Sequence, residues 1–167
     1  MMWPSIVLLT FVTLQRLGEL VLARRNTAAL LARGAREVAP EHYPVMVALH
    51  AGWILGLWLT APGRPVELLW FVVFMGLQAL RLWVLATLKD RWTTRIIILP
   101  GAPLVRSGPY RLLRHPNYAI VVGEIAVLPL AFGLPFYAIV FSLLNALVLL
   151  IRVKAENAAL KSAMILK

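Results

Sequence analysis

The sequence predicts an all-α fold: a polytopic integral membrane helical bundle of about five transmembrane helices, with a cytoplasmic cap and a C-terminal helix extension. The 167 residues are 61% hydrophobic and 14% charged, and the mean hydropathy is +0.82. Soluble domains are roughly 45–50% apolar and about 25% charged. A chain this short could not cover so much apolar surface in water. The apolar residues also form runs of helical length, and most basic residues lie between the runs.

Five apolar runs approach the roughly 20 residues that a membrane-spanning helix needs. Most of them end at prolines, glycines or paired arginines, as expected where helices stop. They cover residues 3–23, 44–60, 66–88, 116–130 and 135–151. The last two form a tight hairpin, and the fifth continues as a polar helix towards the C-terminus. We expect one domain, residues 1–167, with three spans in 1–88 and the cap, hairpin and tail in 89–167.

The distribution of basic residues predicts the orientation. Fourteen of the 17 lie in segments 24–43, 89–114 and 152–167. Cytoplasmic loops carry an excess of Lys and Arg, so these segments are expected in the cytoplasm, with the N-terminus outside. The net charge is +10, and the basic residues that produce it lie mostly beside the spans. We therefore interpret this charge as a determinant of membrane topology and expect no nucleic-acid binding. Arg16 and Glu19 interrupt the first run, and no cleavable signal peptide is expected.

Two residue classes limit the possible chemistry. The chain has no cysteine, which excludes disulfides, thiolate metal ligands and a cysteine nucleophile. No metal site is predicted. Polar side chains inside the spans are costly in a bilayer, so they either form a seam that fixes helix packing or face a functional cavity. Arg16 and Glu19 share a helix face, as do Gln78 and Arg81, and Glu124 lies in the fourth run.

Residues 89–118, the cap, form the most informative segment. Prolines and glycines interrupt it, which excludes a continuous helix. Irregular backbone at membrane depth must be buried in protein or line a cavity. We therefore expect this stretch to fold over the helix ends.

Several residues of the cap predict a ligand site. Pro116 suits the first turn of the fourth helix, which places His115 near its N-cap. Free backbone N–H groups there, together with the charge of Arg114, predict a site for a carboxylate or phosphate. Tyr110 and Tyr118 offer flat faces to an aromatic ring or to a cation such as a sulfonium. Each tyrosine alone would be an ordinary interfacial anchor, but the joint pattern favours a ligand site.

The C-terminal tail adds a second polar face. Arg152 and Glu156 are four residues apart on the continuation of the fifth span, so they share a face. Alone they would be a surface ion pair of at most about 1 kcal/mol. The hairpin brings this face back towards His115, which favours a joint pocket.

These segments resemble the isoprenylcysteine carboxyl methyltransferase family of membrane enzymes. The family pattern is a Leu-Val pair, then Ser-Gly-x-Tyr, then Arg-His-Pro-x-Tyr, with Arg-x-x-x-Glu-Glu near the C-terminus. The matching segments are Leu104 to Val105, Ser107 to Tyr110, Arg114 to Tyr118, and Arg152 with Glu156; Asn157 replaces the second Glu. The resemblance implies S-adenosylmethionine as cofactor, S-adenosylhomocysteine as product, and carboxyl or hydroxyl methylation of a lipid-like acceptor among membrane lipids.

The resemblance also implies roles for single residues. Those expected to bind the cofactor are Ala102, Pro103, Leu104, Val105, Tyr110, Arg114, His115, Pro116, Asn117, Tyr118, Glu156 and Asn157. Arg152 would face the substrate. Arg152 or Arg95 could hold an anionic acceptor, because Arg presents a fixed donor fork. Glu124 or His50 could take a proton if one must leave.

A bacterial branch of the family is a closer likeness. Its members methylate long-chain alkylpyrones or alkylresorcinol-derived quinols. The segments that carry the likeness are Arg16 to Glu19, Arg24 to Asn26, His42 to Pro44, Trp92 to Arg95 and His115 to Tyr118. This likeness implies a bacterial inner membrane, with the active site and C-terminus in the cytoplasm. The acceptor would be such a polyketide or a prenylated cysteine.

Two other functions are also compatible with this sequence. Sterol reductases carry a similar Arg-His-Pro-x-Tyr stretch and use NADPH, although they are usually longer and have more spans. A non-catalytic membrane scaffold would need only a polar seam and interfacial anchors. No Gly-rich dinucleotide fingerprint occurs, so a soluble-type methyltransferase domain is not predicted. No oligomeric state is predicted.

Overall fold

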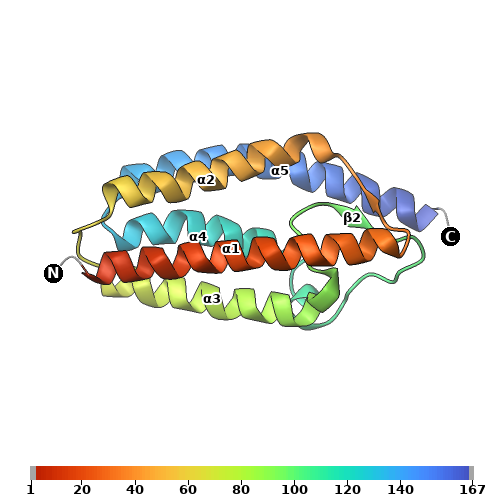
Figure 1. Cartoon of the computed structure of the whole chain (residues 1–167), viewed down its shortest axis with the longest axis horizontal. Coiled ribbons are helices and arrows are strands. Elements are labelled where there is room, and N and C mark those ends of the chain that lie inside the picture. Colours follow the sequence, from red (N-terminus) through yellow and green to blue (C-terminus); the bar gives the residue numbers. More distant parts are fainter. Residues whose placement is uncertain (1–2, 166–167) are drawn as a thin grey trace.

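Five α-helices run side by side, with short turns and a small strand pair between them at one end (Figure 1). The computed structural model describes residues 3–165, and the side chains of residues 3–161. The helices are α1 Trp3–Ala32, α2 Tyr43–Thr60, α3 Leu68–Leu88, α4 Pro116–Ala131 and α5 Pro135–Ile165. The shorter elements are the strands β1 Arg36–Glu37 and β2 Ile97–Ile98 and the 3-10 turns η1 Pro40–His42, η2 Lys89–Arg91 and η3 Gly108–Arg111.

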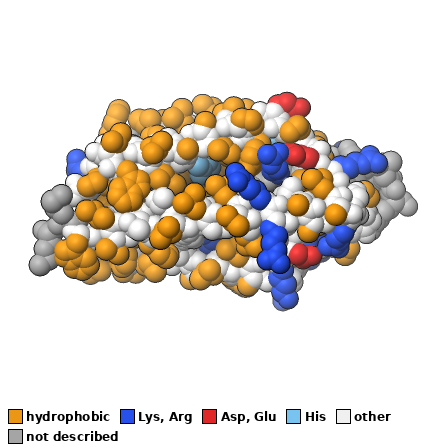
Figure 2. Space-filling model, viewed as in Figure 1, with side chains coloured by type: hydrophobic (Ala, Val, Ile, Leu, Met, Phe, Trp, Pro, Cys, Tyr) orange, Lys and Arg blue, Asp and Glu red, His pale blue; other side chains and the backbone are white. Residues whose placement is uncertain are grey.

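The surface is that of a membrane protein. Within residues 3–165, the four helices α1, α2, α3 and α5 are long and apolar enough to cross a membrane, and α4 is a shorter apolar helix. Leu59 and Phe136 are examples of outward apolar side chains, at 85% and 78% exposed. Apolar side chains cover one end and the middle of the molecule, whereas charged ones gather towards the other end (Figure 2). Exposed apolar surface of this extent marks contact with a membrane, and the predicted all-α membrane fold is confirmed.

Helix α1 is longer than the sequence predicts. The expected loop over residues 24–43 is helical as far as Ala32, because its first part has no proline or glycine and is rich in Ala, Leu and Arg. Gly34 then takes a φ of +86°, and the Ala35 N–H donates to the Leu30 carbonyl at 3.1 Å. This is a Schellman C-cap. The 30 residues of α1 span about 45 Å.

The α4–α5 hairpin is present where the sequence predicts it. Gly133 has a φ of +65°, and the Leu134 N–H donates to the Pro129 carbonyl at 3.0 Å. Helix α4 therefore also ends in a Schellman motif. Pro135 begins α5 at a position where its missing N–H costs nothing. The two helices then pack along each other.

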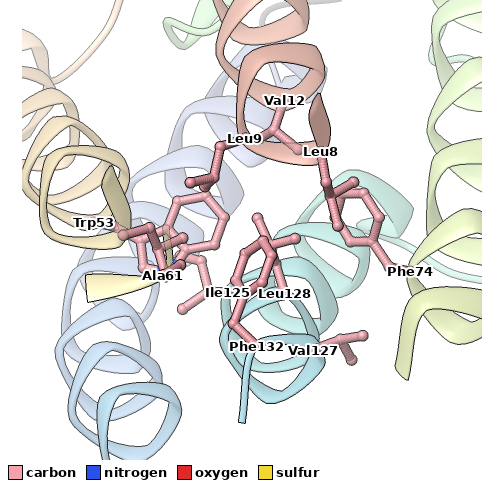
Figure 3. Packing of buried hydrophobic residues seen from close by; sticks show 11 residues of the cluster. Leu8, Leu9, Val12, Trp53, Ala61, Phe74, Ile125, Val127, Leu128 and Phe132 are labelled. Atoms are coloured by element: carbon pink, nitrogen blue, oxygen red, sulfur yellow. The ribbon is translucent and has the colours of Figure 1, made fainter. Parts of the chain in front are cut away.

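A large apolar cluster fills the bundle near the hairpin (Figure 3). Trp53 and Leu57 of α2 are completely buried in it. In a bilayer such contacts stabilise the bundle mainly through close packing, because lipid tails are as apolar as the side chains. The buried members are Leu8, Leu9, Val12, Trp53, Leu57, Ala61, Phe74, Ile125, Val127, Leu128 and Phe132.

Charged and amide side chains form an interior ion cluster next to this apolar packing. Its members are Gln15, Arg16, Glu19, Gln78, Arg81 and Glu124. Glu124 of α4 is completely buried and accepts from Arg81 Nε at 2.8 Å and Gln78 Nε2 at 2.7 Å. Arg16 Nη2 reaches its other oxygen at 2.5 Å. Arg16 and Arg81 each also donate to Glu19 Oε2 at 3.1 Å. Two guanidinium groups thus meet two carboxylates and join three helices.

The cap is attached to the N-terminal half by contacts that the sequence does not predict. Strand β1 pairs antiparallel with β2, and Glu37 lies opposite Ile97. Asn26, near the end of α1, donates through Nδ2 to the carbonyls of Lys89 at 3.0 Å and Trp92 at 2.8 Å. These bonds satisfy backbone carbonyls that an irregular segment would otherwise leave unpaired. The cap therefore rests on α1 as well as on α3.

Replacing Glu124 by Gln should destabilise the bundle strongly, because Arg16 and Arg81 would then share one carboxylate. Breaking a buried ion pair from one side costs about 3–5 kcal/mol, and thermal unfolding in detergent measures the loss. Arg33→Gln is the matched control, since Arg33 pairs with Asp90 at 3.1 Å on the surface. Such exposed pairs contribute about 1 kcal/mol or less. Equal unfolding temperatures for the two variants would contradict the structural role of Glu124.

Candidate active site

A cavity of about 1130 Å³ lies at the end of the bundle that carries the cap. It exists because α4 is short: its 16 residues span about 24 Å, whereas α1 and α5 each span about 45 Å. Helix α4 therefore starts well inside the ends of its neighbours, and the cap folds around the space (Figure 1). The lining comes from the end of α3, the cap, the first turn of α4 and the C-terminal part of α5.

Tyr118, Arg152 and Glu156 form the central hydrogen-bonded unit of the cavity. Arg152 Nε donates to the Tyr118 hydroxyl at 2.8 Å, and that hydroxyl donates to Glu156 Oε2. Arg152 Nη2 also donates to the Thr94 carbonyl at 2.7 Å, and its Nη1 lies 3.4 Å from Met46 Sδ. The Arg152 side chain is buried, so its guanidinium ties the cap, α2, α4 and α5 together.

His115 connects the start of α4 to the same part of α5. Its Nε2 donates to Asn157 Oδ1 at 3.1 Å, and its Nδ1 lies 3.8 Å from Glu156 Oε2. The imidazole stacks on the Tyr118 ring, with the ring centroids 5.3 Å apart. Asn157, which stands where the family pattern has a Glu, thus keeps a contact to His115 without adding a negative charge.

Asn117 contributes a buried polar atom to the residues around the cavity. Its Oδ1 is buried and has no hydrogen-bond partner among the described residues. Buried polar atoms nearly always have a partner, and an exception calls for an explanation such as a ligand. The Asn117 oxygen is therefore available to an N–H or O–H group of a bound molecule.

The backbone at the start of α4 offers less to an anion than the sequence predicts. The N–H groups of Tyr118 and Ala119 both donate to the His115 carbonyl, at 3.1 and 3.3 Å. Pro116 has no N–H. A row of free amides is thus missing from the first turn, and the exposed Arg114 side chain supplies the positive charge at this edge of the cavity.

The residues expected to bind the cofactor divide into two groups. Those that line the cavity are Leu104, Val105, Tyr110, Arg114, His115, Asn117, Tyr118, Glu156 and Asn157. Ala102, Pro103 and Pro116 lie outside the lining. The Pro103 carbonyl accepts from Arg91 Nη1 at 2.8 Å, and Pro116 is buried at the helix start. The second group therefore supports the backbone of the cap.

The two arginines expected to handle the acceptor both line the cavity. Arg152 is fully engaged in the contacts described above. Arg95 Nη1 donates to Glu37 Oε1 at 2.7 Å, and its guanidinium lies 4.2 Å from the centroid of the Tyr43 ring. The hydrogen bond that Arg95 donates to Glu37 raises the pKa of Arg95 further above its usual range, so its charge is permanent. Its side chain is 39% exposed, which leaves part of the donor fork accessible.

Glu124 and His50, the two residues considered as proton acceptors, lie outside the lining of the cavity. Glu124 belongs to the interior ion cluster, where it pairs with the guanidinium groups of Arg16 and Arg81. His50 Nδ1 bonds to the Met46 carbonyl of its own helix at 2.8 Å. Their positions indicate structural roles, and we do not assign either to proton transfer.

Sequence reasoning missed an apolar part of the lining. It comes from the cap and from α5, and consists of Trp92, Ile96, Ile97, Ile98 and Leu160. The apolar run at 96–98 inside a polar segment was a signal, because such a run needs either cover or a ligand. The pairing of β2 with β1, which holds this run in place, has no comparable signal because β1 has only two residues.

Gly108 positions the cap against α3. Its φ is +56°, and a Cβ there would lie 2.4 Å from Thr87 Oγ1 and 3.2 Å from Trp83 Nε1. Gly108→Ala should therefore displace η3 and Tyr110, and limited proteolysis should cleave the cap faster. Gly101→Ala is the matched control, because its φ is +75° but its Cβ would meet open space. It costs only backbone strain of about 1–2 kcal/mol, so equal cleavage rates would refute the packing role.

Tyr110 should titrate as a buried phenol. Burial, with a smaller contribution from the Glu156 carboxylate, raises the pKa of Tyr110 from 10.0 to about 12. The folded state then holds this proton more tightly than the unfolded state, so stability is unaffected below pH 10 and falls as the pH rises from 10 to about 12. In an ultraviolet absorbance titration, the wild type should show a phenol transition centred near pH 12 that is missing from Tyr110→Phe. A lost signal centred near pH 10 would contradict the burial.

Comparison with known proteins matches the half of the chain that builds this cavity. The model of the isoprenylcysteine carboxyl methyltransferase family matches residues 68–162, a range that includes every residue of the lining. The chain is 34% identical over 162 residues to the uncharacterized protein YpbQ of Bacillus subtilis, covering 93% of this chain and 95% of that protein.

A second relative is an uncharacterized protein of Haemophilus influenzae, 25% identical over 151 residues, which covers 87% of this chain and 88% of that protein. No solved structure matches the chain. Neither relative's name specifies an acceptor, so the likeness to the alkylpyrone and alkylresorcinol branch stays a prediction. The chain belongs to the isoprenylcysteine carboxyl methyltransferase family, a family of membrane methyltransferases.

Proposed function

We propose that this protein is an S-adenosylmethionine-dependent methyltransferase that methylates a carboxylate or hydroxyl group of a lipophilic acceptor. The observation that carries the proposal is the meeting of two distant family segments in one cavity. Tyr118 bonds to both Arg152 and Glu156, and His115 bonds to Asn157. A membrane scaffold would have no need for polar side chains that converge on an open space of about 1130 Å³.

The residues of the cavity fit the chemistry of this cofactor. Asn117 Oδ1 lacks a partner among the described residues and can accept from an amino or hydroxyl group. The Glu156 side chain is 27% exposed and can accept from an ammonium group or ribose hydroxyls. The rings of Tyr110 and Tyr118 suit an adenine or a sulfonium. When bound, the cofactor supplies an electrophilic methyl group.

The contribution of the protein would be mainly positioning, since methyl transfer depends on the alignment of two reactants. Arg152 is a positioning residue in this proposal, because Nε and both Nη atoms already contact Tyr118, Thr94 and Met46. Arg95 is the better candidate for contact with an anionic acceptor, given its accessible donor fork. A carboxylic acid or an acidic enol is already ionised at neutral pH, so an acceptor of that kind requires no base in the cavity.

The acceptor would lie with its apolar part along the Ile96 to Ile98 run and Leu160. An alkylpyrone, an alkylresorcinol-type polyketide or a prenylated cysteine would each satisfy this arrangement. We place the cavity on the cytoplasmic side of a bacterial inner membrane, with the N-terminus outside. Thirteen of the 17 basic residues lie in segments 24–43, 89–114 and 152–161, and all three segments belong to the end with the cap (Figure 1), which supports this orientation.

The purified protein in detergent should bind S-adenosylhomocysteine saturably, as measured by isothermal titration calorimetry. His115→Ala and Glu156→Ala should each weaken binding by about 10- to 100-fold, the loss expected when a hydrogen bond to a charged group is removed. Lys154→Gln is the matched control, because Lys154 is exposed on α5 outside the cavity lining. This variant should bind like the wild type.

Other outcomes of the same titration would refute the proposal. Binding of NADPH in place of S-adenosylhomocysteine would favour a reductase of the sterol-reductase type. Folded protein that binds neither molecule would favour a membrane scaffold. Transfer of a labelled methyl group from S-adenosylmethionine into the lipid extract of cells that produce the protein would then identify the acceptor class.

A further inference from the structure

The cap carries a surface to which the proposed methyl transfer assigns no role. It consists of Arg106, Arg111, Leu112 and Leu113, here called the Leu/Arg edge. Leu112 and Leu113 are 77% and 52% exposed. Arg106 and Arg111 are also exposed, and among the described residues neither side chain forms a hydrogen bond or ion pair. All four residues belong to the cavity lining, so the edge forms part of its rim.

Contacts with α3 place this edge beside the membrane-facing surface. The turn η3 packs on the end of α3, where Gly108 lies against Thr87 and Trp83. Trp83 is partly exposed on a helix long enough to cross a membrane. Tryptophan concentrates at membrane–water boundaries. The exposed leucine pair directly follows this turn, so it can enter the acyl region while neighbouring arginines stay at the level of the headgroups.

We propose that the Leu/Arg edge binds anionic phospholipid from the surrounding leaflet. Leu112 and Leu113 insert between the acyl chains, and Arg106 and Arg111 contact lipid phosphates. Two features support this occupant: both arginines lack a partner among the residues that the structure describes, and guanidinium groups match phosphate geometry. The bound lipid thereby completes the rim of the cavity at the side where a lipophilic acceptor would enter.

A spin label can test the proposal because the chain has no native cysteine. Full-length Leu112→Cys carries a nitroxide and is reconstituted in vesicles of phosphatidylglycerol or of phosphatidylcholine. Power-saturation spectroscopy compares access of oxygen, which enters lipid, with access of a nickel chelate, which stays in water. We expect the label to be more protected from the chelate in phosphatidylglycerol. Arg106→Gln and Arg111→Gln should each reduce that preference by about fivefold, the contribution of one basic residue near an anionic surface.

Two controls separate this effect from general changes. Leu143→Cys, labelled at an exposed position of α5, should report the same depth in both lipids. Arg33→Gln removes another exposed arginine, one that pairs with Asp90, and should leave the preference of the Leu112 label unchanged. High salt should weaken the preference, since surface charges are screened.

The proposal is overturned if the Leu112 label is equally accessible to the chelate in both lipids. It is also overturned if Arg106→Gln and Arg111→Gln leave the difference between lipids unchanged, because these arginines would then serve only the interior of the cavity. The readout involves neither cofactor binding nor methyl transfer. Failure of the lipid site and failure of the proposed function are therefore distinguishable.

Discussion

The depth of α4 in the bundle depends on the ion pairs that Glu124 makes with Arg16 and Arg81. Unpaired charge is costly at membrane depth, so α1, α3 and α4 are stable together only when these atoms meet. Glu124 lies about two helical turns from Pro116. Holding Glu124 in the interior ion cluster therefore holds the first turn of α4 well inside the ends of its longer neighbours. The cavity follows from that placement and from the shortness of α4.

The same contacts separate side chains that build the frame from side chains that remain available. Arg81 and Glu124 satisfy each other, and Arg152 satisfies Tyr118 and the Thr94 carbonyl. Saturated groups of this kind rigidify a site but have little left to offer a ligand. The Asn117 side-chain oxygen, which has no partner within residues 3–161, is the opposite case. Residue type alone does not distinguish the two classes. Arg152 and Arg95 both line the cavity, but Arg152 is buried, whereas Arg95 keeps part of its donor fork accessible.

Local patterns explain which parts of the fold could be predicted from the sequence. The apolar runs placed all five helices, and proline and glycine positions placed the hairpin and the irregular cap. The paired Arg24 and Arg25 do not predict the end of α1 correctly, because arginine is a good helix former and the helix continues to Ala32. The partners of Glu124 could not be predicted for a different reason. Its partners Arg16 and Arg81 lie 108 and 43 positions away in the chain, and such pairings depend on the assembled bundle.

The two halves of the chain contribute to the site in different ways: one lines the cavity, and the other positions residues around it. The family match begins at α3, and the cavity lining lies entirely within it. Helix α1 nevertheless supplies Arg16, and α2 supplies Met46 and Tyr43. Glu37 of β1 and Tyr43 are the two residues that hold Arg95. The N-terminal half therefore sets the depth of α4 and the orientation of Arg95 without lining the cavity. Changes there would alter how an acceptor is held while leaving the residues proposed to bind the cofactor unchanged.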